Sequence, residues 1–567
     1  MRGFEESKRF KKRSSIKGQY SEESNNFELY KKALTFQKEG ILNKAAEIYN
    51  ILIKNYYRNE NIFINYAEVC QKLNNPNNAI LLLKEAIKMN PRNSVSFFKM
   101  GYILNNKGNF YEAYPFAKKA IELNPNLWQG YHNLIKILRN LNRPKDAKDY
   151  AKSAKKLFSN NHLFLSLLGD INSDLGNFKE AIKCYKNAIE LSPKDEITLY
   201  TFANFSIGIG NKKESINLFN KILKNNPLHS LSLYSLSTIL DTEEDQVTKN
   251  KITKLRLDDF KSNYDRYTIL FSKSHIFHKI KDFDKSAEFL KKANNLKLKV
   301  KPSNIETVIK TSKKIQEETS KDSSFNISNF QNLRDIFIVG LPRSGSTLVE
   351  SIIGINKDVQ NLGENSIFLN AYMESKRSNF ADIDKIYLKY VKNYSSKKFT
   401  TNKMLSNYMY IPYIVSKLNH SKVIYTFRNP LDNILSMYRA KFNGGGNEYS
   451  SSLTDSAKYY IHQFNLMSFY RNKYKKHIYF LNYDKLVNHT ELEIKKLINW
   501  LGFNWDKSYL QPNKNKQGFF TASNVQVRSP INNKSVGGWE KYSNIMEEPI
   551  KIFRINNFSL DSFKRFT

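Results

Sequence analysis

A short segment near the middle of the chain has the composition of a phosphate-binding loop. An apolar run, Ile336–Gly340, has the length of a buried strand and ends on glycine. The polar stretch LPRSGST, 341–347, follows it, and the helical pattern VESIIG comes next. A strand, a glycine-containing loop and a helix in this order direct main-chain N–H groups toward one anion. The alternative is a simple Ser/Gly helix cap, but PRSGST after an apolar strand has few uses other than anion binding.

The loop departs from the nucleoside-triphosphate P-loop at the position of its lysine. Gly340, Gly345 and Thr347 match the pattern G-x-x-x-x-G-K-[ST], but Ser346 stands where that pattern has lysine. A nucleoside triphosphatase would lose the cation that reaches its β- and γ-phosphates. Arg343 instead places a positive charge inside the loop. These residues therefore predict an anion site other than that of an ATPase.

A second strand–helix pair carries two further candidate phosphate ligands. In VIYTFRNPLDNILSMY, an apolar strand ends at Arg428, and Asn429-Pro430 opens a helix that includes Ser436. Ser436 lies about two helical turns into that helix, so both side chains can converge on one phosphate. Arginine suits bidentate phosphate binding, and it is scarce in this lysine-rich chain. The weaker alternative for Arg428 is an ordinary surface charge.

The segment PRSGSTL resembles the 5′-phosphosulfate loop of the sulfotransferases, enzymes that use 3′-phosphoadenosine 5′-phosphosulfate as donor. The resemblance covers 333–567 and is greatest to the protein-tyrosine sulfotransferases and their bacterial relatives fused behind tetratricopeptide repeats. It implies an α/β, P-loop-like domain with a central parallel sheet. The donor-binding residues that it implies are Arg343, Ser344, Gly345, Ser346, Thr347, Arg428, Ser436, Tyr483, Ser523 and Lys534.

Some of these positions lie in two segments late in the chain. In HIYFLNYDK, Tyr483 follows an apolar strand, at a position like that of the family's nucleotide-contacting tyrosine. Taken alone, it would be a core or strand-edge residue. In TASNVQVRSPINNKSVGG, family members place a serine and a basic loop over the donor, which makes Ser523, Arg528 and Lys534 candidates. The alternative for this second segment is an ordinary surface loop.

The resemblance also implies three catalytic side chains and no metal. Sulfuryl transfer needs a base for the acceptor hydroxyl and cations at the transferring group. Glu364, in NLGEN, resembles the family's catalytic carboxylate, although spacing alone would make it an exposed loop residue. Lys403, in FTTNKMLSN, resembles the lysine on the bridging oxygen, and Arg343 completes the set. Met404-Leu405 stand where acidic and proline residues are usual in the tyrosine-directed branch. Protein tyrosine, glycan, lipid and small-molecule hydroxyls all stay open as acceptors.

The elements that precede this domain repeat with a period of 34 residues. Small residues where two short helices meet allow close packing, and a proline stops the second helix from continuing. This pattern resembles the tetratricopeptide repeat, which predicts an α-solenoid. The recurring positions are Ala79, Ala113, Ala147 and Ala181, and Pro91, Pro125, Pro193 and Pro227. The expected units are 26–59, 60–93, 94–127, 128–161, 162–195 and 196–227, with one more at Tyr267–Asn294.

These patterns predict four parts in the chain. A flexible basic tail covers 1–25, the repeat array 26–297, a connector 298–332 and the sulfotransferase domain 333–567. Repeats of this kind present a concave helical surface to a protein or peptide. An array that merely holds the following domain is an equal alternative.

Composition excludes several other classes. The formal charge is +37, mostly from lysine, and a chain with such a bias need not bind polyanions. No RNA-binding aromatic motif or helix-turn-helix is visible, so no specific nucleic acid is expected. Cys70 and Cys184 are too far apart for a disulfide framework or a metal site. The N-terminus is polar, so no secretory signal is expected. The chain has no long apolar run, so no membrane span is expected, and we expect a cytoplasmic location.

Two functions follow from the sequence. The first is transfer of a sulfuryl group from 3′-phosphoadenosine 5′-phosphosulfate to an acceptor hydroxyl, with the repeats positioning the acceptor or a partner protein. The alternative is a protein-binding scaffold whose sulfotransferase-like domain is inactive.

Overall fold

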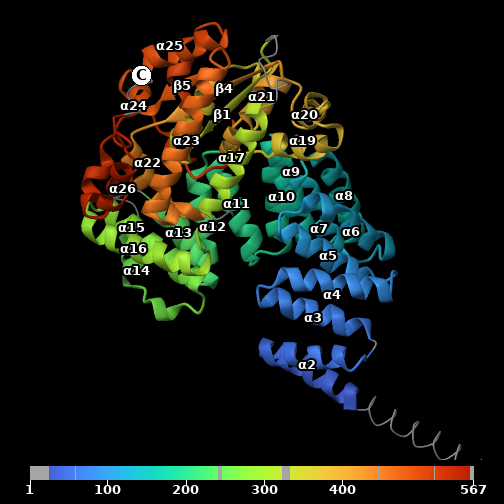
Figure 1. Cartoon of the computed structure of the whole chain (residues 1–567). Coiled ribbons are helices and arrows are strands. Elements are labelled where there is room, and N and C mark those ends of the chain that lie inside the picture. The colour runs from blue at the N-terminus through green and yellow to red at the C-terminus, as the bar shows by residue number, and fades with distance from the viewer. Residues whose placement is uncertain are drawn as a thin grey trace, which may run out of the picture. The chain divides into compact units, whose positions relative to one another are not determined.

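Figure 1 shows the chain as a computed structural model, in which helices precede and then surround a small sheet. The residues that the structure describes are 25–57, 59–240, 246–321, 332–442, 446–515 and 517–561. The predicted tail, 1–25, lies outside this set except for its last residue. The described chain forms two compact units that divide between Ile171 and Asn172.

The first unit is built from consecutive helix pairs. Its helices are one over 25–38, α2 (Leu42–Lys54), α3 (Glu60–Lys72), α4 (Pro76–Met89), α5 (Ser94–Asn106), α6 (Phe110–Leu123), α7 (Trp128–Asn140) and α8 (Pro144–Leu157). Ala79, Ala113 and Ala147, on the second helices of their pairs, are fully buried. A Cβ added at Gly101 would lie 3.0 Å from the main-chain nitrogen of Ala117. Small residues therefore allow α5 and α6 to meet closely, as the period predicts.

The repeat pattern continues into the second unit. α9 (His162–Asp174) crosses the division, and six helices with the remaining repeat pattern follow. They are α10 (Phe178–Leu191), α11 (Glu196–Gly208), α12 (Lys212–Asn225), α13 (Ser230–Ile239), α15 (Asn263–Lys279) and α16 (Phe283–Val300), with the short α14 (Gln246–Lys254) before α15. The division between the units thus falls inside the array, and the later repeats belong to the same compact unit as the sheet.

The central sheet has five parallel strands in the order β2-β3-β1-β4-β5. The strands are β1 (Asp335–Gly340), β2 (Val359–Asn361), β3 (Phe399–Asn402), β4 (Ser421–Phe427) and β5 (Ile478–Asn482). β1 is buried along its whole length, which explains its continuous apolar sequence. Parallel strands end at the same sheet edge, so the loops after β1, β3 and β4 gather there.

Helices cover both faces of the sheet. On one face, Ile336 and Ile338 of β1 pack with Val349 of α18 (Ser346–Ile353) and with Ile494 of α25 (Thr490–Leu501). The opposite face, with Phe337, belongs to a larger core. That core includes α20 (Ile383–Val391), α21 (Ile411–Lys417), α22 (Pro430–Tyr438), α23 (Leu453–Lys473), α26 (Ser543–Ile555) and residues of α15 and α16. Repeat helices thus pack into the same core as the helices that cover the sheet.

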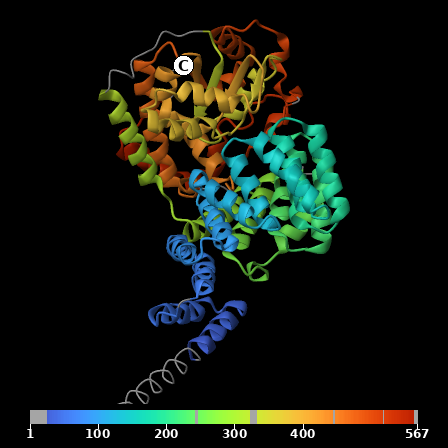
Figure 2. The same ribbon diagram turned by 90° about the vertical axis from the view of Figure 1, so that its right-hand side faces the viewer.

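Figure 2 shows the same arrangement from a second direction. The remaining helices on the sheet side include the connecting α17 (Ile305–Lys321), α19 (Ile367–Ser375) and α24 (Tyr483–Asn488). A repeat solenoid followed by an α/β region with a central parallel sheet confirms the predicted fold class. Among the described residues, no helix combines the length and apolarity that crossing a membrane requires.

Candidate functional site

The loop after β1 is shaped by three residues with positive φ. Gly340 has φ +150°, and an added Cβ would lie 2.4 Å from the main-chain oxygen of Thr426 on β4. Arg343 has φ +69° and Gly345 has φ +96°, so the chain turns sharply before α18 begins at Ser346. The first-turn N–H groups of a helix have no intrahelical partner and form an anion site. The local backbone thus has the form that the sequence predicts for a phosphate loop.

Two hydroxyl groups fix this loop to its surroundings. The Ser344 hydroxyl lies 2.7 Å from the Thr426 hydroxyl and is fully buried. The Ser344 N–H donates to the Leu341 carbonyl at 3.2 Å. The Thr347 hydroxyl lies 3.2 Å from that of Thr521. Ser344 therefore holds the loop on β4, while Ser346 lies in the first turn of α18, beside which an anion is expected to bind.

Arg343 contacts two segments that are distant from it in sequence. Its Nε donates to the Ser436 hydroxyl on α22 at 3.2 Å, and its Nη1 donates to the Ser523 hydroxyl. Nη1 also donates to the Ala522 carbonyl at 2.7 Å, and Nη2 donates to Gln526 Oε1 at 2.6 Å. The structure thus joins Arg343, Ser436 and Ser523, three of the predicted donor-binding residues.

Positive charge is concentrated around Arg343. Burial, together with the nearby charges of Arg428 and Arg439, lowers the pKa of Arg343 to about 10. Arg428 is 4% exposed. Among the described residues, neither the buried Nε of Arg428 nor that of Arg439 has a hydrogen-bond partner. Like charges repel each other where water is excluded, so three neighbouring guanidinium groups favour an anion between them.

Arg428 and Tyr483 form a second contact close to the loop. The Arg428 guanidinium lies 4.8 Å from the Tyr483 ring centroid. The tyrosine ring approaches Gly345 so closely that an added Cβ would lie 2.4 Å from it. Ser535 joins both residues: its carbonyl accepts from Arg428 Nη2 at 2.7 Å, and its hydroxyl lies 3.1 Å from the Tyr483 hydroxyl. Tyr483 therefore links the phosphate loop to the end of β4.

The two other candidates in the C-terminal segment are placed differently. The Lys534 side chain is exposed, and it is the neighbouring Ser535 that contacts Arg428 and Tyr483. Arg528 donates to the carbonyls of Asn515, Gln517 and Gly208, at 2.5, 2.7 and 2.9 Å. Arg528 therefore fixes main chain instead of facing the arginine cluster.

The predicted base and lysine form a close ion pair. Lys403 Nζ donates to Glu364 Oε1 at 2.7 Å. The Lys403 side chain is fully buried, whereas 44% of the Glu364 side chain is exposed. The Lys403 N–H also donates to the Gly363 carbonyl at 2.9 Å, which ties the end of β3 to the loop that carries Glu364. The lysine is fixed inside the protein while the carboxylate reaches solvent.

A profile of the sulfotransferase family matches residues 375–507, and tetratricopeptide-repeat profiles match 29–56, 61–93, 95–127, 163–195 and 267–299. The chain combines tetratricopeptide repeats with a sulfotransferase-family domain. The family match includes Lys403, Arg428, Ser436 and Tyr483 and begins after the phosphate loop and Glu364.

Individual relatives match parts of the chain. An uncharacterized protein of Aquifex aeolicus (strain VF5) is 26% identical over 315 residues, which are 50% of this chain and 41% of that protein. The chain thus spans about two fifths of the length of this curated relative. Two solved repeat structures are similar to shorter parts. The Pseudomonas aeruginosa pilF structure has a TM-score of 0.32 and 15% sequence identity, and the match covers 38% of this chain and 99% of that one. The YrrB structure, described as a tetratricopeptide-repeat protein with an unusual peptide-binding site, has a TM-score of 0.26 and 20% sequence identity. That match covers 34% of this chain and 98% of that one.

Sequence reasoning missed two carboxylates close to the candidate site residues. Glu350, on α18, is 1% exposed, and its Oε1 accepts from the Gly363 N–H at 3.1 Å and the Thr401 hydroxyl at 2.9 Å. Burial raises the pKa of Glu350, while the nearby Lys403 acts in the opposite direction. The sequence signal for Glu350 was its place inside the apolar run LVESII. A glutamate there is expected to be buried, and a buried carboxylate needs hydrogen-bond or charged partners.

Asp432 is the second missed carboxylate. Its oxygens accept from the N–H groups of Gly537 and Trp539 at 2.8 and 3.0 Å, and it lies 3.6 Å from Arg428 Nη2. It therefore holds the glycine-containing part of the C-terminal segment beside Arg428. Its signal was an acidic residue one helical turn after Arg428, in the first turn of α22.

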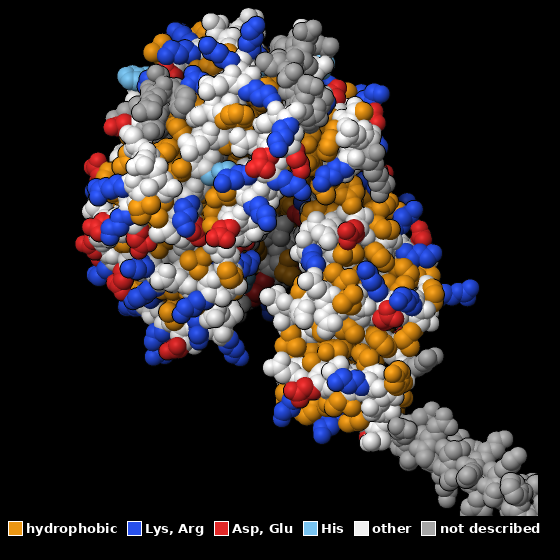
Figure 3. All heavy atoms as spheres, in the orientation of Figure 1, with side chains coloured by type: hydrophobic (Ala, Val, Ile, Leu, Met, Phe, Trp, Pro, Cys, Tyr) orange, Lys and Arg blue, Asp and Glu red, His pale blue; other side chains and the backbone are white. Residues whose placement is uncertain are grey.

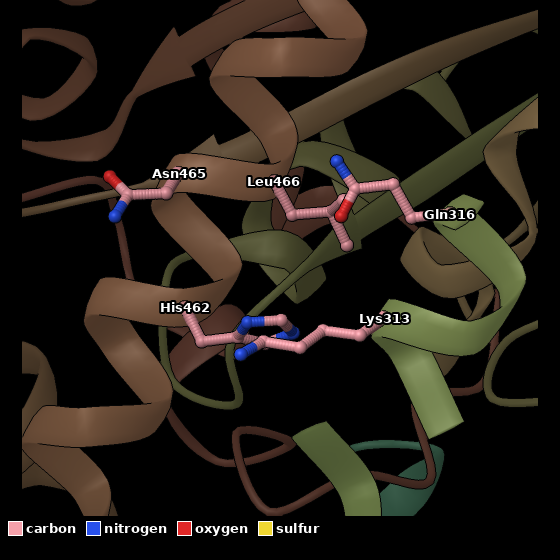
Figure 4. A pocket seen from close by; sticks show the side chains of 5 residues that line it. All are labelled: Lys313, Gln316, His462, Asn465 and Leu466. Carbon is pink, nitrogen blue, oxygen red and sulfur yellow. The ribbon is translucent and has the colours of Figure 1, made fainter. Parts of the chain in front are cut away.

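A separate cavity of about 320 Å³ lies between α17 and α23. Figure 4 shows its lining side chains, with His462 beside Lys313 and Leu466 beside Gln316. The His462 Nε2 atom lies 2.9 Å from the Ser312 hydroxyl, and burial, with the charge of Lys313, lowers the pKa of His462 to about 4. None of these residues belongs to the arginine cluster or to the Lys403–Glu364 pair. Among the described residues, no group of three metal-ligating side chains comes together.

Proposed function

We propose that this chain transfers a sulfuryl group from 3′-phosphoadenosine 5′-phosphosulfate to an acceptor hydroxyl. The single observation that carries the proposal is the Lys403–Glu364 ion pair, 2.7 Å long, in a region that also holds the loop 341–347 and three neighbouring arginines. A cation at a leaving oxygen and a base at an acceptor hydroxyl are the two requirements of in-line sulfuryl transfer.

The donor-binding roles divide between two anion sites. We assign the 5′-phosphosulfate to the N–H groups of the loop 341–347, the Ser346 and Thr347 hydroxyls and Arg343. The 3′-phosphate is assigned to Arg428 and Ser436, with Tyr483 and Ser523 beside the nucleotide. The buried Nε of Arg428 supports this assignment: it lies 4.0 Å from Asp484 Oδ1 but has no hydrogen-bond partner among the described residues, and a bound phosphate oxygen would supply one.

The transfer step uses the pair at the end of β3. Glu364, the more exposed partner, accepts the proton of the acceptor hydroxyl as the acceptor oxygen bonds to sulfur. The bond between sulfur and the bridging oxygen breaks, and Lys403 stabilises the charge on that oxygen in the departing 3′-phosphoadenosine 5′-phosphate. Protonation of Glu364 weakens its hold on Lys403, so the ammonium group becomes available when the leaving oxygen needs it.

We also propose that the repeats present the acceptor or a partner protein to this site. The proposed boundaries remain 26–297 for the array, 298–332 for the connector and 333–567 for the transferase. Support comes from the end of α16 at Val300 and the start of β1 at Asp335.

The test is transfer of radioactive sulfur from labelled donor by the full chain to components of a host-cell extract. We expect a labelled product with the natural chain and none with Glu364→Gln, while both proteins bind 3′-phosphoadenosine 5′-phosphate equally. A natural chain that binds this nucleotide but labels nothing would support an inactive scaffold.

A further inference from the structure

One C-terminal segment, 517–528, contacts both the phosphate loop and the repeats; we call it the lid segment. On the loop side, Ala522, Ser523 and Gln526 accept hydrogen bonds from Arg343. Thr521 lies 3.2 Å from the Thr347 hydroxyl. The lid segment thus holds the Arg343 side chain in place.

On its other side, the lid segment inserts an aromatic ring among repeat residues. The Phe520 ring stacks on Phe205 of α11 with centroids 6.0 Å apart, and it meets Phe178 of α10 edge to face at 6.5 Å. Its position requires glycine at the end of α11, because an added Cβ on Gly208 would lie 2.2 Å from the ring. The ring therefore fits a place formed by the repeats.

Two hydrogen bonds to one carbonyl strengthen this contact. The Gly208 carbonyl accepts from the Phe519 N–H at 3.0 Å and from Arg528 Nη2 at 2.9 Å. Gly208 is the last residue of α11, where helix carbonyls lack intrahelical partners and the helix dipole favours a cation. The same Arg528 guanidinium binds the carbonyls of Asn515 and Gln517. One arginine thus ties the lid segment to the repeat helix.

We propose that helix α11 of the repeat array positions the donor-binding site through this contact among Gly208, Phe520 and Arg528, here called the repeat clamp. The clamp holds the lid segment where Ser523 and Gln526 meet Arg343. Donor binding then depends on repeat residues that do not touch the donor. The identity of the donor nucleotide in this inference rests on the proposed function.

The test changes the clamp from both sides and measures the affinity of the full chain for 3′-phosphoadenosine 5′-phosphate by calorimetry. Phe520→Ala removes the ring, and Gly208→Ala displaces it from the repeat side. Alanine has a higher helix propensity than glycine, so Gly208→Ala does not weaken α11 itself. We expect each variant to bind about tenfold more weakly. Phe520→Tyr, which keeps the ring, restores the affinity.

The matched control is Phe469→Ala, because Phe469 is 40% exposed and Phe520 is 48% exposed. This control keeps the natural affinity, and thermal melting shows that all variants stay folded. Unchanged binding by Phe520→Ala or Gly208→Ala overturns the clamp, as does an equal loss in Phe469→Ala or no recovery with Phe520→Tyr. No binding by the natural chain instead contradicts the proposed function.

Discussion

At the residue scale, the charged side chains of the candidate site fall into two groups. Lys403 is paired with Glu364 and lies near the buried Glu350, while Arg343 lies near two other arginines. One part of the site thus places a lysine between two carboxylates, and the other brings three arginines together, with Asp432 and Asp484 beside Arg428. That separation suits a reaction in which a proton leaves on one side and a phosphate group is held on the other.

Arg343 is expected to contribute more to nucleotide binding than any lysine could at its position. Arg343→Lys and Arg343→Ala should both weaken binding of 3′-phosphoadenosine 5′-phosphate, because a charge-assisted hydrogen bond contributes about 1.5–3 kcal/mol and lysine lacks the planar fork. Calorimetry of the full chain measures the loss. Arg554→Ala, on α26, controls for the lost positive charge and should bind normally. A loss in Arg554→Ala equal to that in Arg343→Ala would show a nonspecific charge effect, and normal binding by Arg343→Lys would show that the planar fork is not needed.

The raised pKa of Glu350 predicts that the stability of the protein depends on pH. Its pKa is raised in the folded protein, so the folded state holds the proton more tightly than the unfolded chain does. Its stabilising effect is fully present below the ordinary pKa of glutamate, about 4.3, and is lost as pH rises through the higher folded value.

The natural chain should therefore lose stability relative to Glu350→Gln from about pH 4 upward, by about 1.4 kcal/mol for each unit by which the two pKa values differ. Urea unfolding of both proteins across this range measures the difference. A difference that does not change with pH would contradict the raised pKa.

At the element scale, most of the helices and the first strand could be predicted from the spacing of small and apolar residues in the sequence. The 34-residue spacing identified the helix pairs because small residues must recur where helices meet, and Pro91 stands two residues past the end of α4. The apolar run before the loop identified β1 because a central parallel strand is buried on both faces. The strand order could not be predicted, since neighbours in the sheet are not neighbours in sequence.

The candidate site was predictable where local sequence decides geometry. The turn of the loop 341–347 follows from its strand–helix connection, whereas the convergence of Arg428 and Ser436 stays a prediction, because the Ser436 hydroxyl accepts from Arg343. Glu364 and Lys403 followed only from the family resemblance. Arg528 is the informative exception. A basic residue in a C-terminal loop resembles a donor ligand in sequence, but its guanidinium binds Gly208 of a repeat 320 residues earlier. Contacts of that range leave no local pattern.

Gly340 should be the least replaceable residue of the loop element. Gly340→Ala strains a backbone with φ +150° and places Cβ 2.4 Å from a main-chain oxygen that cannot move without breaking the β1–β4 pairing. We expect a loss of at least about 3 kcal/mol in the free energy of unfolding. Gly502→Ala is the control, with φ +81° and nothing within 4 Å, and should cost about 1–2 kcal/mol. Equal losses in urea unfolding would contradict the close approach.

At the scale of the whole molecule, the boundary between the two compact units does not coincide with the boundary between the repeats and the α/β region. Helices from α10 onward share a unit with the sheet, and α15 and α16 contribute to its core. The later repeats are therefore part of the same compact unit as the α/β region, whereas the earlier ones form a unit of their own. The repeat clamp is one place where this shared packing reaches the candidate site.

The charge of +37 should not make the chain a nucleic-acid-binding protein. On the face drawn in Figure 3, Lys and Arg side chains are spread among acidic and hydrophobic ones instead of forming one stripe. Fluorescence anisotropy with duplex and single-stranded DNA should show only salt-sensitive, nonspecific binding, weaker than about 1 μM at physiological salt. Tight binding that persists in high salt would contradict this view of the charge.

The central claim is most directly tested by calorimetric titration of the full chain with 3′-phosphoadenosine 5′-phosphate and, separately, with ATP. The loop lacks the P-loop lysine, and we propose that Arg428 and Ser436 bind a 3′-phosphate, which ATP does not have. We predict binding of 3′-phosphoadenosine 5′-phosphate that is at least about 100-fold tighter than binding of ATP, a difference of about 2.7 kcal/mol. Equal affinity for the two nucleotides, or binding of ATP alone, would contradict the account.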